Sequence, residues 1–439
     1  MKNKQSLALV AALLACIATL HAQTNGSNSP YSYYGLGLLN DRTGALATSM
    51  AGATTAMRGG NIVNPLNPAS FSATDSLTCL FDIGMSLQNA NLDEGGRKVN
   101  AKNTSLDYVT LGFRIAPRLG LSVGMLPIST VGYKMKRTPP SQNVTAGEVT
   151  ETDTYSGDGG LHNVYAGLGW EPFRGFSVGV SGGYIWGDIT HNISAKLSDA
   201  SAGSRSRKYE TEIRSYKLDV GMQYEQNIGK GNSLTLGLRY GLGHTLQGKS
   251  TFSDGVLQGN TLSGDTLTLR NGYELPHSFS VGLAWQRGNT LRVSADYTLQ
   301  KWGSVKSPVV GTTAEGGFSY TSEKGAYTDM NRYAIGAEYI PMGSHYNVRK
   351  HFRFRAGFAY TSPYARVNGQ DGPKHYLATL GVGIPIHNPA HSSRVIILNI
   401  GGAYERVQPS VAGMLKENYL RFSIGLSFNE QWFAKWKAL

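Results

Sequence analysis

The sequence predicts an all-β protein, a 14-stranded antiparallel transmembrane β-barrel with an N-terminal plug (hatch) inside its lumen. Three observations predict this fold. The chain has 439 residues, of which only 16% are charged, against about 25% in an average soluble protein. It is rich in glycine and tyrosine, with 55 and 24 residues. After about residue 76, apolar and polar residues alternate with a period of two, as in strands that face lipid on one side and a lumen on the other.

Composition argues against other classes of protein. The mean hydropathy is −0.25, and no apolar run reaches the ~18 residues of a membrane-spanning helix. Plentiful Tyr, Val, Ile and Leu argue against disorder. The formal net charge of +12 suits the anionic headgroups of outer-membrane lipid and lipopolysaccharide, which we expect as partners. No basic cluster is interleaved with aromatic residues, so no nucleic-acid partner is expected.

The N-terminus has the pattern of a secretory signal peptide, expected over residues 1–22. Lys2 and Lys4 precede an apolar run from Leu7 to Leu20, and Ala22 ends a cleavage site. Leu13-Leu14-Ala15-Cys16 also resembles a lipoprotein cleavage box, with Cys16 to be acylated. Cleavage after Ala22 leaves Cys79 as the only thiol, which excludes an intramolecular disulfide.

The predicted barrel occupies residues 76–429, with a short periplasmic tail at 430–439. Alternation is clearest at 176–186 and 291–300. Short connections such as Pro117-Arg118 alternate with long ones near 91–103 and 248–272. Outer-membrane barrels of Gram-negative envelopes combine short periplasmic turns with longer outer loops. We therefore expect an integral protein of the cell outer membrane with both chain ends in the periplasm.

The predicted lumen face carries charges of both signs and many glycines. Two interpretations remain for the charges: they pair with one another or with the plug, or some line a permeation path. The small side chains beside them leave room for a second object inside the barrel. The lumen-facing charges are Asp107, Arg114, Asp219, Arg239, Arg292, Asp296, Arg353 and Arg355, and the glycines are Gly112, Gly179, Gly237, Gly282, Gly336 and Gly357.

Residues 23–75 are the candidate for that second object. They lack sustained strand alternation and are rich in small residues. Asn and Pro recur in Asn64-Pro65-Leu66-Asn67-Pro68-Ala69-Ser70, a density that produces fixed turns. We predict an N-terminal plug segment that folds up into the barrel. The alternative is a disordered periplasmic leader.

Three motifs on this framework resemble the FadL/TodX family of outer-membrane transporters. They are Asn67-Pro68-Ala69, Tyr31-Ser32-Tyr33-Tyr34-Gly35-Leu36-Gly37 and Gly157-Asp158-Gly159-Gly160-Leu161. The resemblance covers nearly the whole mature chain. It implies a porin-like but plugged barrel that passes hydrophobic small molecules, such as fatty acids, by diffusion.

The resemblance also implies a third strand that kinks and opens the wall toward the membrane. Leu126-Pro127 lies within the third predicted strand. Proline donates no ladder hydrogen bond and belongs at edges or bulges. We therefore expect a local break in pairing, with a lateral opening or a simple bulge as its two interpretations. The outer loops are rich in Ser, Thr and Asp, so the sequence shows no counterpart of the family's apolar outer capture groove.

The sequence predicts no enzyme, no cofactor and no metal site. It contains no Cys pair, H-E-x-x-H, G-x-S-x-G or P-loop motif. The leading hypothesis is passive uptake of a hydrophobic or amphipathic ligand. The alternative is a non-transporting FadL-like barrel, a structural subunit of an outer-membrane protein assembly or secretion complex. An apolar tunnel between plug and wall would favour the first, and a fully ion-paired lumen the second.

Overall fold

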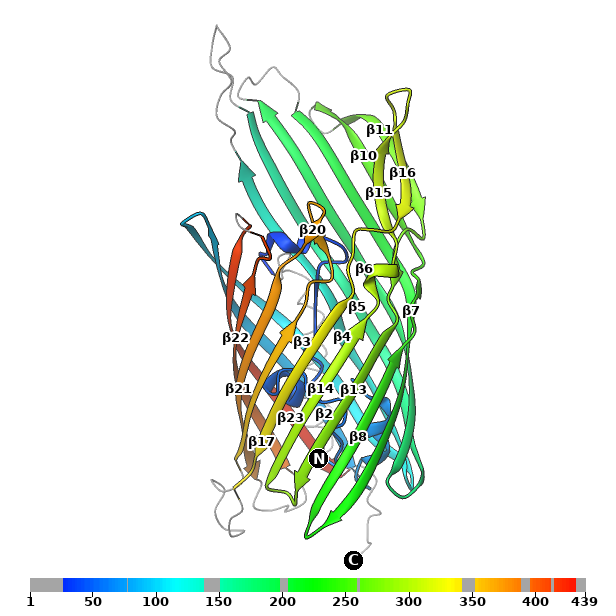
Figure 1. The fold of residues 1–439 in the computed structure, drawn as a ribbon, viewed down its shortest axis with the longest axis vertical. Coiled ribbons are helices and arrows are strands. Elements are labelled where there is room, and N and C mark those ends of the chain that lie inside the picture. The colour runs from blue at the N-terminus through cyan, green and yellow to red at the C-terminus, as the bar shows by residue number, and fades with distance from the viewer. Residues whose placement is uncertain are drawn as a thin grey trace, which may run out of the picture.

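The computed structural model describes residues 27–76, 78–137, 151–197, 204–258, 261–341, 352–387, 395–411 and 414–431. Fourteen antiparallel strands close a barrel, which confirms the predicted fold (Figure 1). Twelve are continuous, and two are interrupted, so that β8 continues as β10 and β11 as β13. The barrel strands are β2 (Thr78–Glu94), β3 (Arg97–Ala116), β4 (Leu119–Arg137), β5 (Glu151–Phe173), β6 (Phe176–Leu197), β7 (Ser204–Gly229), β8 (Asn232–Gly241), β10 (Gly248–Gln258), β11 (Thr261–Arg270), β13 (Ser278–Arg287), β14 (Leu291–Gln300), β17 (Met330–Tyr339), β18 (Arg353–Thr361), β21 (Lys374–His387), β22 (Val395–Gln408) and β23 (Lys416–Gln431).

Smaller elements lie inside the barrel and at its outer end. The N-terminal segment, residues 27–75, forms η2 (Pro30–Tyr33), β1 (Leu38–Leu39), α2 (Ala45–Ser49) and η3 (Pro68–Ala73). It runs within the barrel (Figure 1). The outer end carries β9 (His244–Thr245), β12 (Glu274–Leu275), η4 (Trp302–Ser304), β15 (Ser307–Thr312), β16 (Phe318–Glu323), β19 (Arg366–Val367) and β20 (Gln370–Asp371).

Several strands are longer than the hydrophobic pattern predicts. The long loops expected near 91–103 and 248–272 are wrong, because pairing continues through both regions. β2 and β3 run to a tight turn at Gly95-Gly96, where both glycines have positive φ. β10 and β11 pair up to Gln258 and Thr261. Backbone pairing needs no apolar face, so these ladders extend past the lipid-facing band.

The described strands also shift the predicted limits of the barrel. β2 begins at Thr78 and β23 ends at Gln431, so two residues assigned to the tail belong to the last strand. Residues 432–439 and the predicted signal peptide lie outside the described residues. Within the described parts of the chain, no helix is long and apolar enough to cross a membrane.

The outer surface of the barrel is an apolar band between two sets of aromatic rings. One set is a row of tyrosines, Tyr297, Tyr333, Tyr360 and Tyr376, in register on β14, β17, β18 and β21 with successive ring centroids 5.0, 6.4 and 5.3 Å apart. The other, toward the short turns, includes the exposed rings of Trp170, Tyr224, Tyr339 and Phe354. Aromatic belts of this kind mark the two membrane–water interfaces of an outer-membrane barrel.

Candidate functional site: the lumen and its N-terminal segment

In the half of the lumen next to the short turns, which we call the lower lumen, the N-terminal segment packs directly against glycines of the barrel wall. A Cβ at Gly179 would lie 2.5 Å from the backbone nitrogen of Ala69, and one at Gly336 would lie 2.7 Å from Cβ of Met50. Backbone therefore packs where any side chain would collide. The six glycines predicted on the lumen face all make such contacts: Gly112 with Val63, Gly179 with Pro68 and Ala69, Gly237 with Thr55 and Ala56, Gly282 with Thr55, and Gly336 and Gly357 with Met50.

The Asn67-Pro68-Ala69 motif joins this segment to the wall. Asn67 is fully buried and caps η3, since its Oδ1 accepts a hydrogen bond from the backbone N–H of Ala69 at 3.1 Å. Its Nδ2 donates to the carbonyls of Thr55 at 2.8 Å, Leu238 at 3.2 Å and Met222 at 3.3 Å. Pro68 occupies the first position of the 3₁₀ turn, where its missing N–H costs no bond. One side chain thus holds the turn, a neighbouring loop and two barrel strands.

Wall charges of the lower lumen pair with one another. Glu338 on β17 is 1% exposed and accepts from Arg355 at 2.7 Å and Arg292 at 3.2 Å. Arg353 adds a further positive charge close to Glu338. Higher up, Asp219 pairs with Arg239 at 2.8 Å and also with Lys217.

Other wall charges bind the N-terminal segment. Asp107 pairs with Arg42 at 2.7 Å, and Asp296 accepts from the backbone N–H of Thr55 at 2.7 Å. Arg332 pairs with Asp41. Arg58 of the segment pairs with Glu171 at 3.0 Å and Glu225 at 3.5 Å. Of the predicted lumen charges, Arg114 differs: its Nε donates to the Ala116 carbonyl at 3.1 Å. These contacts favour pairing as the interpretation of the lumen charges.

The ladder between β3 and β4 ends part-way up the wall. Its uppermost pair is Val109↔Met125, although both strands continue upward. Pro127 lies two residues above this pair and is aligned with His162 of β5 on its other side, next to a bulge at Ile128. Leu126-Pro127 therefore lies beside the point where the β3–β4 ladder stops. We call this boundary the β3–β4 seam.

The N-terminal segment takes the place of β3 along the upper edge of β4. β1 pairs with β4 through Leu38↔Thr130 and Leu39↔Ser129. The N–H of Asn40 donates to the Ile128 carbonyl at 2.8 Å. Higher up, the backbone of Gly132 binds Ser27 and Ser32, each at 3.1 Å. On the other side of the seam, Nδ2 of Asn28 donates to Oδ1 of Asn103 on β3 at 2.6 Å. Residues 27–42 thus contact both strands of the seam, and we call them the seam segment.

The two tyrosine- and glycine-rich motifs meet at the upper end of this region. Tyr33 packs edge-on against Tyr133 and His191, at 6.1 and 5.1 Å between ring centroids. The hydroxyl of Tyr133 is hydrogen-bonded to Nδ1 of His191 at 2.9 Å. Gly157 leaves the space that the ring of Tyr133 occupies. The motifs therefore serve to dock the seam segment on β4–β6.

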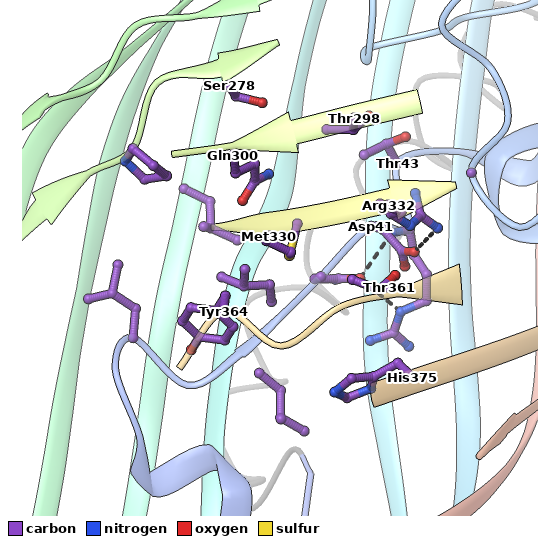
Figure 2. Close-up of a pocket in the computed structure, with 18 of the residues that line it drawn as sticks. Asp41, Thr43, Ser278, Thr298, Gln300, Met330, Arg332, Thr361, Tyr364 and His375 are labelled. Atoms are coloured by element: carbon purple, nitrogen blue, oxygen red, sulfur yellow. Dashed lines mark hydrogen bonds and ion pairs between the residues drawn. The ribbon is translucent and has the colours of Figure 1, made fainter. Parts of the chain in front are cut away.

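A cavity of about 360 Å³ lies between the seam segment and the opposite wall. Leu126, Pro127 and Ile128 line its seam side. Figure 2 shows Met330 and Tyr364 in one part of the lining and Arg332, Asp41 and His375 in another. His375 Nδ1 lies 2.8 Å from Glu405, which also pairs with Arg421 at 3.2 Å. The cavity is therefore apolar at one end and ionic at the other.

Sequence reasoning missed most of this lining. Trp302 is buried in η4, and Tyr364 comes from the connection between β18 and β19. Their rings lie 4.9 Å apart and belong to the same apolar cluster as Leu36 of the seam segment. Both residues lie in or near stretches predicted to be outer loops. The alternation of apolar and polar residues therefore could not identify them as part of a cavity lining.

Comparisons with known proteins agree with this architecture. The BamG family model matches residues 3–438. No curated protein sequence matches the chain. Among solved structures, a FadL homologue of Pseudomonas aeruginosa has a TM-score of 0.57 at 14% identity, covering 89% of this chain and 98% of that one. The toluene transporter TodX of Pseudomonas putida gives 0.57 at 16%, covering 89% and 98%. The monoaromatic hydrocarbon channel CymD gives 0.55 at 15%, covering 91% and 99%.

At these identities the likeness to solved structures establishes a shared fold, that of the FadL/TodX outer-membrane proteins. The family model extends over almost the entire sequence, including the N-terminal segment that packs in the lumen. The chain is an outer-membrane β-barrel that belongs to the BamG family.

Proposed function

We propose that this protein is a plugged, FadL-like barrel that acts as a structural subunit of an outer-membrane protein assembly complex. The observation that carries the proposal is the ion-paired lower lumen. Arg292, Arg355 and Glu338 pair within the wall, while Arg58 joins the N-terminal segment to Glu171 and Glu225. In this proposal the N-terminal segment is a permanent plug.

The energetics of the lumen support a plug that stays in place. Removing one partner from a buried ion pair costs about 3–5 kcal/mol, because the other charge is left without compensation. A hydrophobic solute that crossed the lower lumen would have to separate such pairs and displace backbone packed on glycine. A structural subunit needs neither event. The match to the BamG family model supports the same proposal.

The test is purification of the tagged protein from native outer membranes in a gentle detergent. We expect one or more outer-membrane or periplasmic proteins to co-elute at a fixed ratio, and depletion of the protein to lower the level of other barrel proteins. A tagged FadL-type transporter from the same membranes is the matched control. A protein that elutes alone, also after cross-linking in cells, would refute the assembly role.

A second candidate function rests on the cavity beside the seam. Leu126 and Pro127 line a space with an apolar end, next to the last β3–β4 pair. This arrangement supports passive uptake of a hydrophobic small molecule that enters or leaves through a lateral opening at the seam. Proteoliposomes with the purified protein should then take up a labelled long-chain fatty acid or toluene faster than empty vesicles. Equal rates would remove this candidate.

A further inference from the structure

The short turns at the periplasmic end share a basic side chain. Four of them are described, and each exposes one Arg or Lys: Arg118 between β3 and β4, Arg174 between β5 and β6, Lys230 between β7 and β8, and Arg287 at the end of β13. Among the described residues, none of the four forms an ion pair. We call these four residues the basic rim.

The two glutamates nearest the β5–β6 turn pair with the N-terminal segment and not with the basic rim. Glu171 and Glu225 are next to the β5–β6 turn, since Glu171 Oε1 accepts from Gly175 N–H at 3.0 Å and Glu225 N–H donates to the Gly175 carbonyl at 2.7 Å. Both carboxylates point inward to Arg58 of the N-terminal segment. Glu171 and Glu225 thus form their ion pairs with Arg58, and among the described residues the four rim cations have no ion-pair partner.

Two rim residues adopt a backbone conformation that favours glycine. Arg118 has φ of 63° and Lys230 has φ of 51°. Side chains with a Cβ occupy this left-handed region at a conformational cost, and turns of this kind usually select Gly or Asn. Lys230 lies between Gly229 and Gly231, so the turn keeps a charged residue where small neighbours are already present. The charge itself is the feature that distinguishes these positions.

Large apolar side chains lie immediately above the basic rim on the outer surface. Ile115 is 53% exposed, Phe173 59% and Ile228 56%, and each lies within three residues of a rim cation. Phe173 also stacks on Phe176 across the same turn, with 4.9 Å between ring centroids. An apolar residue in the hydrocarbon edge and a cation just below it match the boundary between acyl chains and headgroups.

We propose that the basic rim binds the phosphate headgroups of anionic phospholipids in the periplasmic leaflet of the outer membrane. Three of the four cations, Arg118, Arg174 and Lys230, have an exposed apolar neighbour on the outer surface of the barrel. This surface faces the bilayer, so acyl chains cover Ile115, Phe173 and Ile228 while the adjacent cations meet headgroups, which favours a lipid over an acidic protein. Each basic residue at a membrane surface is attracted to anionic lipid, and salt weakens this attraction. The inference does not depend on the assembly role.

The experiment measures lipid preference by tryptophan quenching, since Trp170 lies in the aromatic belt next to the rim. The full protein is reconstituted with brominated phosphatidylglycerol or brominated phosphatidylcholine. Wild type should prefer phosphatidylglycerol several-fold at low salt, and the preference should fall with added salt. The variant R118Q/R174Q/K230Q/R287Q should show no preference and unchanged heat-modifiable mobility on gels.

The matched control is R97Q/K98Q/K134Q/K136Q, which removes four exposed cations from the opposite end of the barrel. It should keep the wild-type preference. Equal quenching by both lipids in wild type would overturn the proposal, as would an unchanged preference in the rim variant. Loss of a co-purifying acidic protein from the rim variant, with lipid preference intact, would instead assign the rim to a protein partner.

Discussion

The lower lumen and the seam are closed by the same N-terminal segment in different ways. In the lower lumen, the backbone around Met50, Thr55 and Pro68 lies on wall glycines, and a buried ion pair network surrounds it. At the seam, the contacts are edge hydrogen bonds and side chains, and a cavity remains beside them.

This difference shows where the molecule has room to rearrange. Backbone packed on glycine has no side chain that can rotate away, so any displacement is collective. The seam segment is held by separate hydrogen bonds, each of which contributes only about 0.5–1.5 kcal/mol net. We therefore expect substitutions in the lower lumen to have large effects on folding, and substitutions at the seam to act mainly on access to the cavity.

The largest effect on closure of the lumen is expected for Gly179→Val. The new side chain would overlap Pro68 and Ala69, so η3 must leave the wall. Overpacking of a filled interior costs about 1–3 kcal/mol or more. We expect a lower midpoint of thermal unfolding and increased conductance in planar bilayers. The control is Gly182→Val on the same strand, where a Cβ meets nothing within 4 Å. Identical behaviour of the two variants would show that η3 does not close the lumen at this level.

A similarly large effect is expected for Glu338→Gln, which leaves Arg292 and Arg355 without their shared carboxylate. Breaking a buried pair of this kind costs about 3–5 kcal/mol, measured as a lower denaturant midpoint in lipid vesicles. Glu210→Gln is the control, because its pair with Lys208 is exposed and contributes about 0–1 kcal/mol. Equal midpoints for the two variants would mean that the lumen network does not hold the barrel together.

An intermediate effect is expected at the seam for Gly37→Ala. Gly37 has φ of 92°, and a Cβ would lie 2.7 Å from the Thr130 carbonyl oxygen, so β1 should detach from β4. With Cys79 replaced, a cysteine at Leu38 should then react faster with a membrane-impermeant thiol reagent. The control for backbone strain is Gly95→Ala. Gly95 also has a positive φ, of 57°, but a Cβ added there would meet no atom within 4 Å. Unchanged labelling would indicate that β1 does not need this close approach.

The smallest effect on stability is expected for Pro127→Val, which adds one backbone donor and a good β-former. The gain is limited to about 0.5–1.5 kcal/mol, so the heat stability should stay near that of wild type. If a hydrophobic ligand passes the seam, uptake in proteoliposomes should fall sharply, because the new N–H group and branched side chain narrow the space beside the last β3–β4 pair. Uptake equal to that of wild type would show that Pro127 has no role in the passage of the ligand, but it would not argue against transport by the protein.

The sequence by itself was sufficient for the barrel. The alternation of apolar and polar residues at 176–186 and 291–300 fits only a β-strand, since successive side chains of a strand point to opposite faces. The same local logic located Gly179 and Gly336 on the lumen face, because each shares a face with the polar positions of its strand. The same reasoning failed at 91–103 and 248–272, where the strands continue through stretches that are mostly polar and rich in glycine.

Only the tertiary structure decided what fills the lumen and where the wall is unpaired. Pro68 packs on Gly179, and Leu38 takes the place of β3 beside Thr130. Both contacts join residues about 90 to 110 positions apart in the sequence. Such contacts are set by shape complementarity and hydrogen bonding after the barrel has closed, and they leave no periodic trace in the chain. The alternation of apolar and polar residues predicts which face of the sheet a side chain lies on. Which residue it contacts on that face depends on the tertiary structure.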